Sequence, residues 1–377
     1  MSILYCSSRR CFGLNTLLML SDGRYKKVQH IKVGDKLMGE DSAERTVKRL
    51  IRGRDMMYRV IPALGFPYRV SKWHKLVLCS VKPPTVEKTD SGKYLLRWCT
   101  EEGYINRKIF DDLNIAMDYL SILPEKVTVE IPVCDYVQRS DEWKSYFAGY
   151  RTGVRFSRKT TTLHPYLLGL WLGQTSVTTR IVFEDDDVAE YAHKKLDEID
   201  CHLSSVSVVI GNTARNLFWE ELTYQKLFSV KHIPFEYKCN SRRNRLLLLA
   251  GIIDSDGWLS KNAYKIQHTD KPLLEDICFV AQSLGLRATY RSISRPWCSS
   301  ELKIYECRIF GAISDIPVKS SSNKITTPIQ YENTNNVPIK VEVDEQDDYY
   351  GFVLNTKGRI LLGDFTVVQS ECNVEEE

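Results

Sequence analysis

Short apolar runs separated by turn residues dominate the chain from residue 11 to about residue 82. The run at residues 16–20 ends at a turn signal, Ser21-Asp22-Gly23. Further runs follow at residues 36–38, 57–60 and 68–70. Strands of this length, with a turn signal every dozen residues or so, are typical of a compact all-β domain. This part of the chain is therefore predicted to consist of short strands.

The hydrophobic period changes at about residue 165, after a stretch from residue 83 that shows no clear pattern. Residues 187–199 and 273–284 have helical spacing, and residues 180–183 and 205–210 alternate as strands do. Residues 312–345, rich in Ser, Asn, Thr and Pro, are predicted to form a linker. Two final strands are predicted at residues 349–354 and 360–368. The pattern favours a β domain interrupted by an inserted α/β domain.

Two apolar segments in the α/β part have nearly the same sequence. Residues 167–174 are LLGLWLGQ and residues 249–256 are LAGIIDSD, so the segments start 82 positions apart (249 minus 167). Such a repeat predicts two similar halves that face each other. Glycine has no Cβ, so the glycine in each segment would let two helix backbones approach closely. We expect the helices to cross at a pseudo-twofold axis, with Gln174 and Asp256 together at their C-terminal ends. The alternative is a pair of core helices with a chance repeat.

The last residue of each segment determines which chemistry the helix ends support. Two facing carboxylates with Mg²⁺ between them would form a phosphodiester-hydrolysing site, because the metal activates water and stabilises the leaving oxygen. Gly257 would let the chain turn sharply out of the second helix. Here Asp256 would face Gln174, whose neutral amide oxygen is a poorer Mg²⁺ ligand than a carboxylate.

Bulk composition narrows the class of protein. The 377 residues are 43% hydrophobic and 27% charged, which is ordinary for a globular protein with two or three domains. No apolar run approaches the roughly 20 residues that span a bilayer, and no signal peptide is evident, so an intracellular protein is expected. The 11 cysteines include no C-x-x-C pair, which argues against a zinc ribbon or a disulfide framework.

Basic residues cluster just before each apolar segment, although the net charge is only +4. Such clusters are either solvated faces or contacts to the phosphates of a nucleic acid, and their positions favour phosphate contacts. The candidate DNA-binding residues are Arg151, Arg155, Arg158, Lys159, Arg242 and Arg243.

The two apolar segments resemble the LAGLIDADG motif of homing endonucleases in its single-chain form with two motifs. The resemblance implies an α/β endonuclease domain at residues 161–330, built of two pseudo-twofold αββαββα halves whose strands form a saddle on double-stranded DNA. The family's acid is the eighth residue of each motif. By resemblance, Asp256 and Gln174 are therefore the catalytic and metal-binding positions, with Mg²⁺ or Mn²⁺ as the cofactor.

Further site residues follow from the same resemblance. Lys231, in Val230-Lys231-His232-Ile233-Pro234, matches the basic segment ahead of the second motif and is a candidate for the first catalytic lysine. Such a lysine would neutralise phosphate charge or tune the attacking water. Lys324 is its candidate counterpart in the second half, and Asp185 is a candidate auxiliary acid.

The β parts of the chain resemble the Hint domain of inteins and hedgehog proteins. The matching segments are residues 11–23, 33–39, 53–58, 71–74, 347–352 and 361–368. This resemblance implies a Hint-like β domain at residues 11–160, which holds a DNA-recognition insert, and its closing strands at residues 331–370. Residues 1–10 and 371–377 would be tails. Both resemblances together point to intein-derived homing endonucleases, of the type found in the vacuolar ATPase and in free-standing mating-type relatives.

Protein splicing needs chemistry at both ends of a Hint domain. Cys11 could attack the preceding carbonyl while His74 polarises the amide, and Ser71 stands where the family has threonine. At the other end, Gln369 and Ser370 occupy the positions of a histidine and of the asparagine that cyclises, and Glu371 follows. Serine cannot form a succinimide and glutamate is no acyl acceptor, and the flanks are too short for a host protein. Splicing is therefore expected to be lost, with these residues as relics.

The predicted function is site-specific DNA cleavage by a homing endonuclease that uses a divalent metal at a long recognition site. The alternative is a sequence-specific DNA-binding protein or a nickase, because Gln174 replaces the first motif's acid. An autoprocessing Hint protein is disfavoured by the residues at the C-terminal end of the domain. We expect a nuclear monomer with internal pseudo-symmetry, with DNA as its partner and no membrane association.

Overall fold

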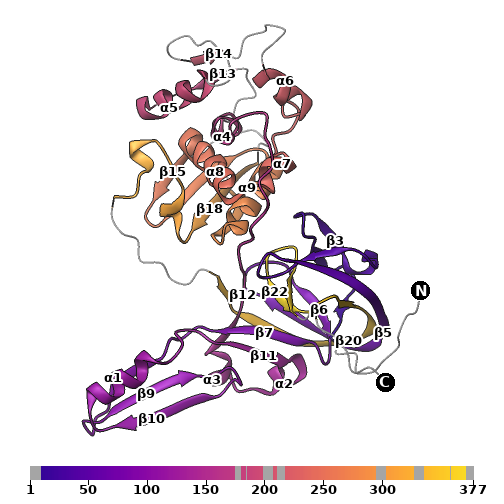
Figure 1. Cartoon of the computed structure of the whole chain (residues 1–377), viewed down its shortest axis with the longest axis vertical. Coiled ribbons are helices and arrows are strands. Elements are labelled where there is room, and N and C mark those ends of the chain that lie inside the picture. Colours follow the sequence, from indigo (N-terminus) through magenta and orange to yellow (C-terminus); the bar gives the residue numbers. More distant parts are fainter. Residues whose placement is uncertain are drawn as a thin grey trace. The chain divides into compact units, whose positions relative to one another are not determined.

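The computed structural model describes residues 10–174, 180–183, 185–197, 207–209, 217–293, 303–326, 335–356 and 358–370. The chain divides into two compact units, one made of residues 1–152 with 335–377 and the other of residues 153–334 (Figure 1). The division expected from the sequence places the boundaries at residues 160/161 and 330/331. Within the described part of the chain, no helix is long and apolar enough to cross a membrane.

Two long antiparallel strands organise the first unit. Strand β5 (Glu44–Pro62) pairs with β20 (Ile339–Leu354) along most of its length. The five-stranded sheet has the order β20-β1-β6-β5-β4, and β20 also pairs with β5, so four of its strands form a closed ring. The other members are β1 (Phe12–Gly13), β4 (Lys36–Met38) and β6 (Tyr68–Ser71).

The linker predicted at residues 312–345 is wrong for its last part, because residues 339–345 belong to β20. Acidic side chains of β20 are paired with an arginine of β6. Arg69 Nε donates to Asp344 and Arg69 Nη1 donates to Asp347, each at 2.6 Å. Strands β6 and β20 each pair with β5, and these ion pairs join the two strands on either side of it. Sequence composition alone does not show these opposite charges meeting.

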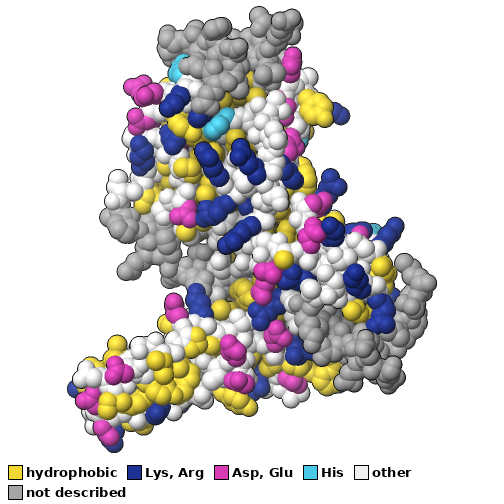
Figure 2. Space-filling view, viewed as in Figure 1, with side chains coloured by type: hydrophobic (Ala, Val, Ile, Leu, Met, Phe, Trp, Pro, Cys, Tyr) yellow, Lys and Arg dark blue, Asp and Glu magenta, His cyan; other side chains and the backbone are white. Residues whose placement is uncertain are grey.

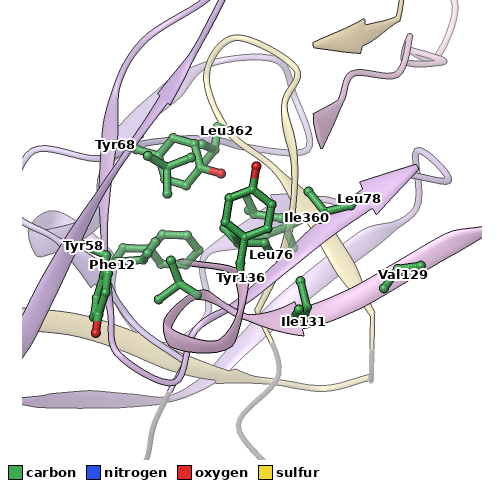
Figure 3. Close-up of a cluster of buried hydrophobic side chains, with 14 of the residues drawn as sticks. Phe12, Tyr58, Tyr68, Leu76, Leu78, Val129, Ile131, Tyr136, Ile360 and Leu362 are labelled. Carbon is green, nitrogen blue, oxygen red and sulfur yellow. The ribbon is translucent and has the colours of Figure 1, made fainter. Parts of the chain in front are cut away.

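A second set of strands encloses the core of this unit. A four-stranded sheet has the order β11 (Thr128–Pro132), β7 (Lys75–Ser80), β12 (Phe147–Tyr150) and β19 (Asn336–Val337). Hairpins are formed by β2 (Leu17–Met19) with β3 (Tyr25–Lys27), and by β21 (Arg359–Leu361) with β22 (Val367–Gln369). The short helices are η1 (Val28–His30), α2 (Val133–Gln138) and α3 (Asp141–Lys144). Figure 3 shows Phe12 from the start of the chain in one apolar cluster with Ile360 and Leu362 from its end.

The stretch without a clear sequence pattern contains a small three-stranded sheet with a helix on one face. Its strands are β8 (Thr85–Lys88), β9 (Tyr94–Cys99) and β10 (Ile105–Phe110), and the helix is α1 (Leu113–Ser121). Asp112 caps α1 by accepting hydrogen bonds from the backbone N–H groups of Asn114 and Ile115. The Tyr119 ring packs 5.7 Å from both the Trp98 and Phe110 rings, measured between centroids, which anchors the helix on the sheet.

The second unit contains both predicted repeat segments. Its first half contains α4 (Pro165–Gly173), β13 (Arg180–Val182), α5 (Asp186–Asp197), β14 (Ser207–Val209) and α6 (Leu217–Tyr224). The second half contains α7 (Phe235–Lys238), α8 (Arg242–Asp256), β15 (Gly257–Ser260), β16 (Ala263–His268), α9 (Lys271–Ser283), β17 (Arg287–Ile293), β18 (Ile304–Phe310), η2 (Ile313–Asp315) and η3 (Ser321–Asn323). From α8 to β18, the longer elements follow the expected αββαββ order.

Helices α4 and α8 cross with their backbones in direct contact (Figure 1). A Cβ at Gly169 would overlap the carbonyl oxygen of Leu248, and a Cβ at Gly251 would overlap that of Tyr166. These two contacts are related by the 82-residue offset of the repeat (169 to 251 and 166 to 248). Equivalent residues therefore make equivalent contacts, which is what a pseudo-twofold axis through the crossing requires.

Substituting Gly251 with alanine should destabilise this crossing. The added methyl would overlap the Tyr166 oxygen and lie 2.9 Å from the Leu170 nitrogen. Overpacking of a dense core costs about 1–3 kcal/mol, and we expect it to outweigh the gain of about 1 kcal/mol in helix propensity. The midpoint of urea unfolding, followed by circular dichroism, should fall. Ser255→Ala is the control in the same helix, because the Ser255 hydroxyl oxygen is buried without a hydrogen-bond partner. A Gly251→Ala midpoint equal to the wild-type value would contradict the contact.

Candidate functional site

The C-terminal ends of α4 and α8 meet beside the helix crossing. Gln174 is the first residue beyond α4 and has extended backbone angles, whereas Asp256 is the last residue of α8 and is exposed. A Cβ at Gly173 would lie 2.7 Å from Ser255 Cβ, so the residues directly before Gln174 and Asp256 are in contact. The geometry thus brings both predicted motif positions to one end of the crossing.

Two helix C-termini at one place create a negative electrostatic environment, because unpaired carbonyl groups point out of each end. The Lys231 ammonium partly neutralises this negative potential at the end of α4. It is fully buried, donates to Trp171 O at 2.8 Å and to Gln174 O, and lies 4.3 Å from the centroid of the Trp171 ring. Burial lowers the pKa of Lys231 to about 8, although the carboxylates of Asp270 and Asp256 favour its charged form. Lys231 therefore caps α4, and the Asp256 carboxylate stabilises its charged form.

A histidine that the sequence analysis missed also contacts this helix end. His268, the last residue of β16, is 1% exposed. Its Nδ1 accepts the Asp270 N–H at 3.0 Å, which leaves the proton on Nε2, 3.2 Å from Gln174 O. Burial lowers the pKa of His268, and the Lys231 charge acts in the same direction. The Gln174 carbonyl thus accepts hydrogen bonds from both Lys231 and neutral His268. No motif spacing singles out this histidine in the sequence.

The Asp185 carboxylate accepts hydrogen bonds that stabilise the start of α5. Its Oδ1 accepts from the backbone N–H groups of Asp187 and Val188 at the start of α5, and its Oδ2 accepts from Ser320 Oγ at 2.9 Å. Burial would raise the pKa of Asp185, but these hydrogen bonds, that from Ser320 foremost, lower it. The carboxylate caps α5, and a role as auxiliary acid stays a prediction.

Lys324 and Lys231 occupy different environments. The Lys324 side chain is 53% exposed and its Nζ lies 3.6 Å from Asp187 Oδ2, whereas Lys231 is buried. The segment before Lys324 is fixed by Asp254, which accepts from the Lys319 N–H at 2.6 Å and from Tyr166 OH at 2.8 Å. Burial raises the pKa of Asp254, and these hydrogen bonds oppose the rise. The equivalence of the two lysines in catalysis stays a prediction.

Arg151 does not fit the predicted phosphate contact. It belongs to the first unit, where its Nη2 donates to Leu64 O at 2.7 Å and to Asp364 Oδ2 at 2.9 Å. The side chains of Arg151 and Asp364 are only 12% and 6% exposed, so the two form a structural ion pair. A phosphate would have to break this ion pair in order to bind Arg151.

The other predicted DNA-binding residues lie in the second unit. Lys159 is partly buried, and its Nζ lies 4.2 Å from the centroid of the Phe235 ring. Arg242 pairs with Asp315 at 2.7 Å, with both side chains about half exposed. The exposed members are Arg155, Arg158, Arg242 and Arg243. Their exposure is compatible with phosphate contacts, which stay a prediction.

The residues of a polar face on the second unit were not predicted. The four-stranded sheet has the order β15-β16-β18-β17, and one of its faces is buried by residues that include Tyr264, Ile266, Cys307 and Ile309. Strand alternation places the remaining residues on the opposite face. These residues include Trp258, Lys265, Gln267, Arg287, Thr289, Arg291, Glu306 and Arg308. Figure 2 shows Lys and Arg side chains gathered on the unit that holds this sheet. Polar residues at alternate positions in the middle of β16, β17 and β18 are the signal that could have identified the face, although Ile293, Ile304 and Phe310 follow the same alternation at the strand ends.

The helix ends supply oxygen donors that suit a hard divalent cation. Among the residues described, no group of three or more His, Cys, Asp and Glu side chains could enclose a metal ion. Mg²⁺ usually binds one or two carboxylates and completes its shell with water and substrate phosphate, so it does not need such a group. The Asp256 carboxylate and the Gln174 amide oxygen fit this pattern, and two helix C-termini favour a cation between them.

The first unit contains the predicted splicing residues Cys11, Ser71 and His74 in one cluster. The Cys11 N–H donates to Ser71 Oγ, and the Ser71 N–H donates to Cys11 O, each at 3.0 Å. The His74 N–H donates to Ser71 O at 2.9 Å. The His74 ring is fully buried, its two nitrogens have no hydrogen-bond partner, and burial lowers its pKa to about 3. The serine hydroxyl thus orients the amide that precedes Cys11.

The closing residues of the Hint-like unit are buried. Gln369 lies at the end of β22 opposite Arg359, and its Oε1 has no hydrogen-bond partner. Ser370 Oγ donates to Gly358 O at 3.2 Å. Glu371 lies outside the described residues. Gln369 and Ser370 therefore occupy a packed strand end. Ser370, at the position of the cyclising asparagine, has no side-chain amide, and Gln369 stands one position before it.

Two family models match this chain. Residues 11–98 match the family described as "Hom_end-associated Hint", and residues 232–327 match "Homing endonuclease". The two matches fall in different structural units, the first in the β unit and the second in the α/β unit. They confirm the fold class and the resemblance to intein-derived homing endonucleases that the sequence predicts.

Two curated relatives match shorter stretches. The catalytic subunit of the V-type proton ATPase from Candida tropicalis is 48% identical over 78 residues, which cover 18% of this chain and 7% of the relative. The replicative DNA helicase DnaB of Mycobacterium intracellulare is 30% identical over 125 residues, which cover 33% of this chain and 19% of the relative. The chain therefore spans well under a quarter of the length of each relative.

Solved structures match parts of the chain. The homing endonuclease I-DmoI, in a crystal with DNA and Mn, is 14% identical, covers 39% of this chain and 89% of its own, and has a TM-score of 0.28. An intein-like domain from Clostridium thermocellum is 16% identical, covers 38% of this chain and 93% of its own, and has a TM-score of 0.17. Likenesses of this size carry no functional argument.

The buried Lys231 ammonium should make stability depend on alkaline pH. Its pKa is about 8 in the folded state against 10.5 for the ordinary side chain. At a pH between these two pKa values the folded protein binds fewer protons than the unfolded chain, so the free energy of unfolding increases as the pH rises. The gain is lost as the pH falls through 8. Relative to Lys231→Gln, the wild type should gain on the order of 1–3 kcal/mol across this window.

Urea unfolding at pH 7.5, 8.5, 9.5 and 10.5 measures this difference. The exposed Lys303→Gln variant is the matched control and should keep a constant offset from the wild type. A constant offset for Lys231→Gln as well would show that the ammonium is not desolvated.

Proposed function

We propose that this chain, which carries the paired Hint and homing endonuclease domains of the intein-derived homing endonucleases, binds double-stranded DNA and hydrolyses phosphodiester bonds at a long specific site. The observation that carries the proposal is the meeting of two helix C-termini at Gln174 and Asp256, with the buried Lys231 beside them. Such a place attracts cations, and a cation is what an approaching phosphodiester needs.

The polar face of β15 to β18 supports the DNA partner. It presents Lys265, Arg287, Arg291 and Arg308 on one sheet whose other face is packed against helices. Basic side chains neutralise phosphates, and a ribbon of strands fits the major groove, where bases are distinguished by their hydrogen-bonding groups. Because cellular DNA is the substrate class, the proposal includes a nuclear location. The internal pseudo-symmetry lets one chain present both half-sites.

A divalent cation, Mg²⁺ or Mn²⁺, would be held by the Asp256 carboxylate and the Gln174 amide oxygen. When bound, it would activate water and stabilise the leaving oxygen of the phosphodiester. Asp256 supplies the only side-chain charge of this pair, so the two motif positions would hold a cation unequally. Lys231 keeps the end of α4 in place and adds positive charge near the phosphate. Cleavage of one strand is accordingly faster than cleavage of the other, which makes nicking the second candidate outcome.

The Hint-like unit is proposed to be retained as a structural and DNA-contacting domain without splicing. Cys11 and Ser71 keep the arrangement that orients the first amide. The other end lacks its chemistry, because Ser370 has no amide nitrogen that could attack its own carbonyl to form a succinimide. His74 is buried without partners for its ring nitrogens, which holds it neutral.

Nicking of supercoiled plasmid DNA distinguishes the roles of the two motif positions. The plasmid carries this protein's own locus, and nicked and linear products are quantified with Mg²⁺ or Mn²⁺. Asp256→Asn should reduce both products at least about 100-fold, because it removes the charged metal ligand. Gln174→Asp should raise the linear fraction, because it restores the second carboxylate.

Two further measurements keep this test decisive. Asp22→Asn removes an exposed carboxylate from the other unit and should cut like the wild type. Binding to the same DNA in EDTA shows whether each variant is folded and competent. If Asp256→Asn binds and still cuts at the wild-type rate, Asp256 is not the catalytic acid.

Loss of splicing is tested by placing residues 11–370 between two reporter domains. Gel electrophoresis should show the intact fusion, with no ligated pair of reporters, because Ser370 cannot cyclise. The Cys11→Ala fusion should give the same pattern of bands. Appearance of a ligated product that depends on Cys11 would overturn the proposed loss.

A further inference from the structure

A buried carboxylate lies in the middle of the basic face of the β15–β18 sheet. Glu306, on β18, is 6% exposed, whereas the side chains of its neighbours Arg291 and Arg308 are 63% and 37% exposed. Burying a charge is costly unless it is paired and hydrogen-bonded. A carboxylate also weakens the attraction of this face for phosphates. Its presence there calls for a role other than general affinity for DNA.

Glu306 accepts three hydrogen bonds from side chains on the same face. Its Oε1 accepts from Arg291 Nη2 at 3.1 Å and from Arg308 Nε at 3.0 Å, and its Oε2 accepts from Gln267 Nε2 at 3.1 Å. Burial would raise the pKa of Glu306, but these hydrogen bonds, with that from Gln267 foremost, lower it. The carboxylate is therefore ionised and holds one nitrogen of each partner.

The register of the sheet aligns these residues. Gln267, Glu306 and Arg291 are directly opposite one another on β16, β18 and β17. Three strands spaced at about 4.8 Å span about 10 Å, which matches a major groove about 12 Å wide. Arginine pairs with two acceptors of guanine, and glutamine pairs with the edge of adenine. The row therefore carries residue types suited to reading bases, already held in place.

We propose that Glu306 is a positioning residue that sets the DNA sequence specificity of this sheet. It holds Gln267, Arg291 and Arg308 in fixed orientations, from which they read about three adjacent base pairs. A held guanidinium loses less side-chain freedom on binding a base than a free one, and it fits wrong bases less well. The negative charge lowers affinity for DNA of any sequence, so the device favours discrimination over strength. The inference rests on the proposed DNA-binding function.

Selection from a random duplex library tests the proposal without knowledge of the target. Full-length wild type, Glu306→Gln and Glu275→Gln each select duplexes in EDTA, which prevents metal-dependent cleavage, and the selected pools are sequenced. Glu275 lies on α9, on the other side of the sheet, where it contacts Lys271 and Tyr290. Both variants remove one negative charge, so Glu275→Gln controls for the change in net charge.

Glu306→Gln is expected to relax selection at about three adjacent base pairs and to leave the rest of the selected motif unchanged. Discrimination at those pairs should fall roughly 10-fold, while binding to a random duplex stays equal or becomes stronger. Glu275→Gln should keep the wild-type motif. Thermal unfolding of both variants shows whether they are folded.

Three other outcomes are decisive. An unchanged motif for Glu306→Gln would overturn the inference and leave the proposed function standing. A uniform loss of selection at every position would also overturn it, because Glu306 would then support the fold rather than a local contact. If the wild type selects no motif at all, the proposed DNA recognition fails, and this inference fails with it.

Discussion

The contact between α4 and α8 is the constraint on which the second unit depends. Gly169 and Gly251 let the two backbones touch, and no side chain can be added at either position without overlap. This closeness fixes the distance between the helix axes, and with it the convergence of the helix C-termini. The residues that follow, Gln174 and Asp256, are placed by the crossing itself. Chemistry at the helix ends therefore depends on backbone packing inside the unit.

The two halves agree in packing and differ in charge. Reciprocal contacts of equivalent residues show that the repeat is preserved in the backbone. At the helix ends, however, α8 carries a carboxylate, whereas α4 has a neutral amide and is capped by Lys231 and His268. The two helix ends, which the pseudo-twofold axis relates, therefore carry opposite charges: a positive cap on α4 and a negative side chain on α8. Under the proposed function, this asymmetry leads to unequal cleavage of the two DNA strands.

The β unit shows how the two ends of a chain form one core. Strand β20 pairs with both β1 and β5, and Phe12 packs in one apolar cluster with Ile360 and Leu362. An inserted unit can be accommodated because β12 and β19, which flank it in the sequence, are paired with each other. The arrangement at Cys11 survives in this frame because it consists of main-chain hydrogen bonds and a buried serine. Packing of the fold is sufficient to maintain it, with or without splicing.

The sequence by itself determined the repeat, the helices that carry it, the interrupted β domain and the identity of the residues at both motif ends. These features are local, because a glycine in an apolar helix or a run of alternating residues encodes its own element. The tertiary structure decided the contacts that join distant positions. Lys231 meets Gln174 across 57 positions, His268 meets it across 94, and Arg69 meets Asp347 across 278. The row around Glu306 also depends on strand register, because pairing between strands decides which side chains stand opposite one another, and no single strand specifies its partner.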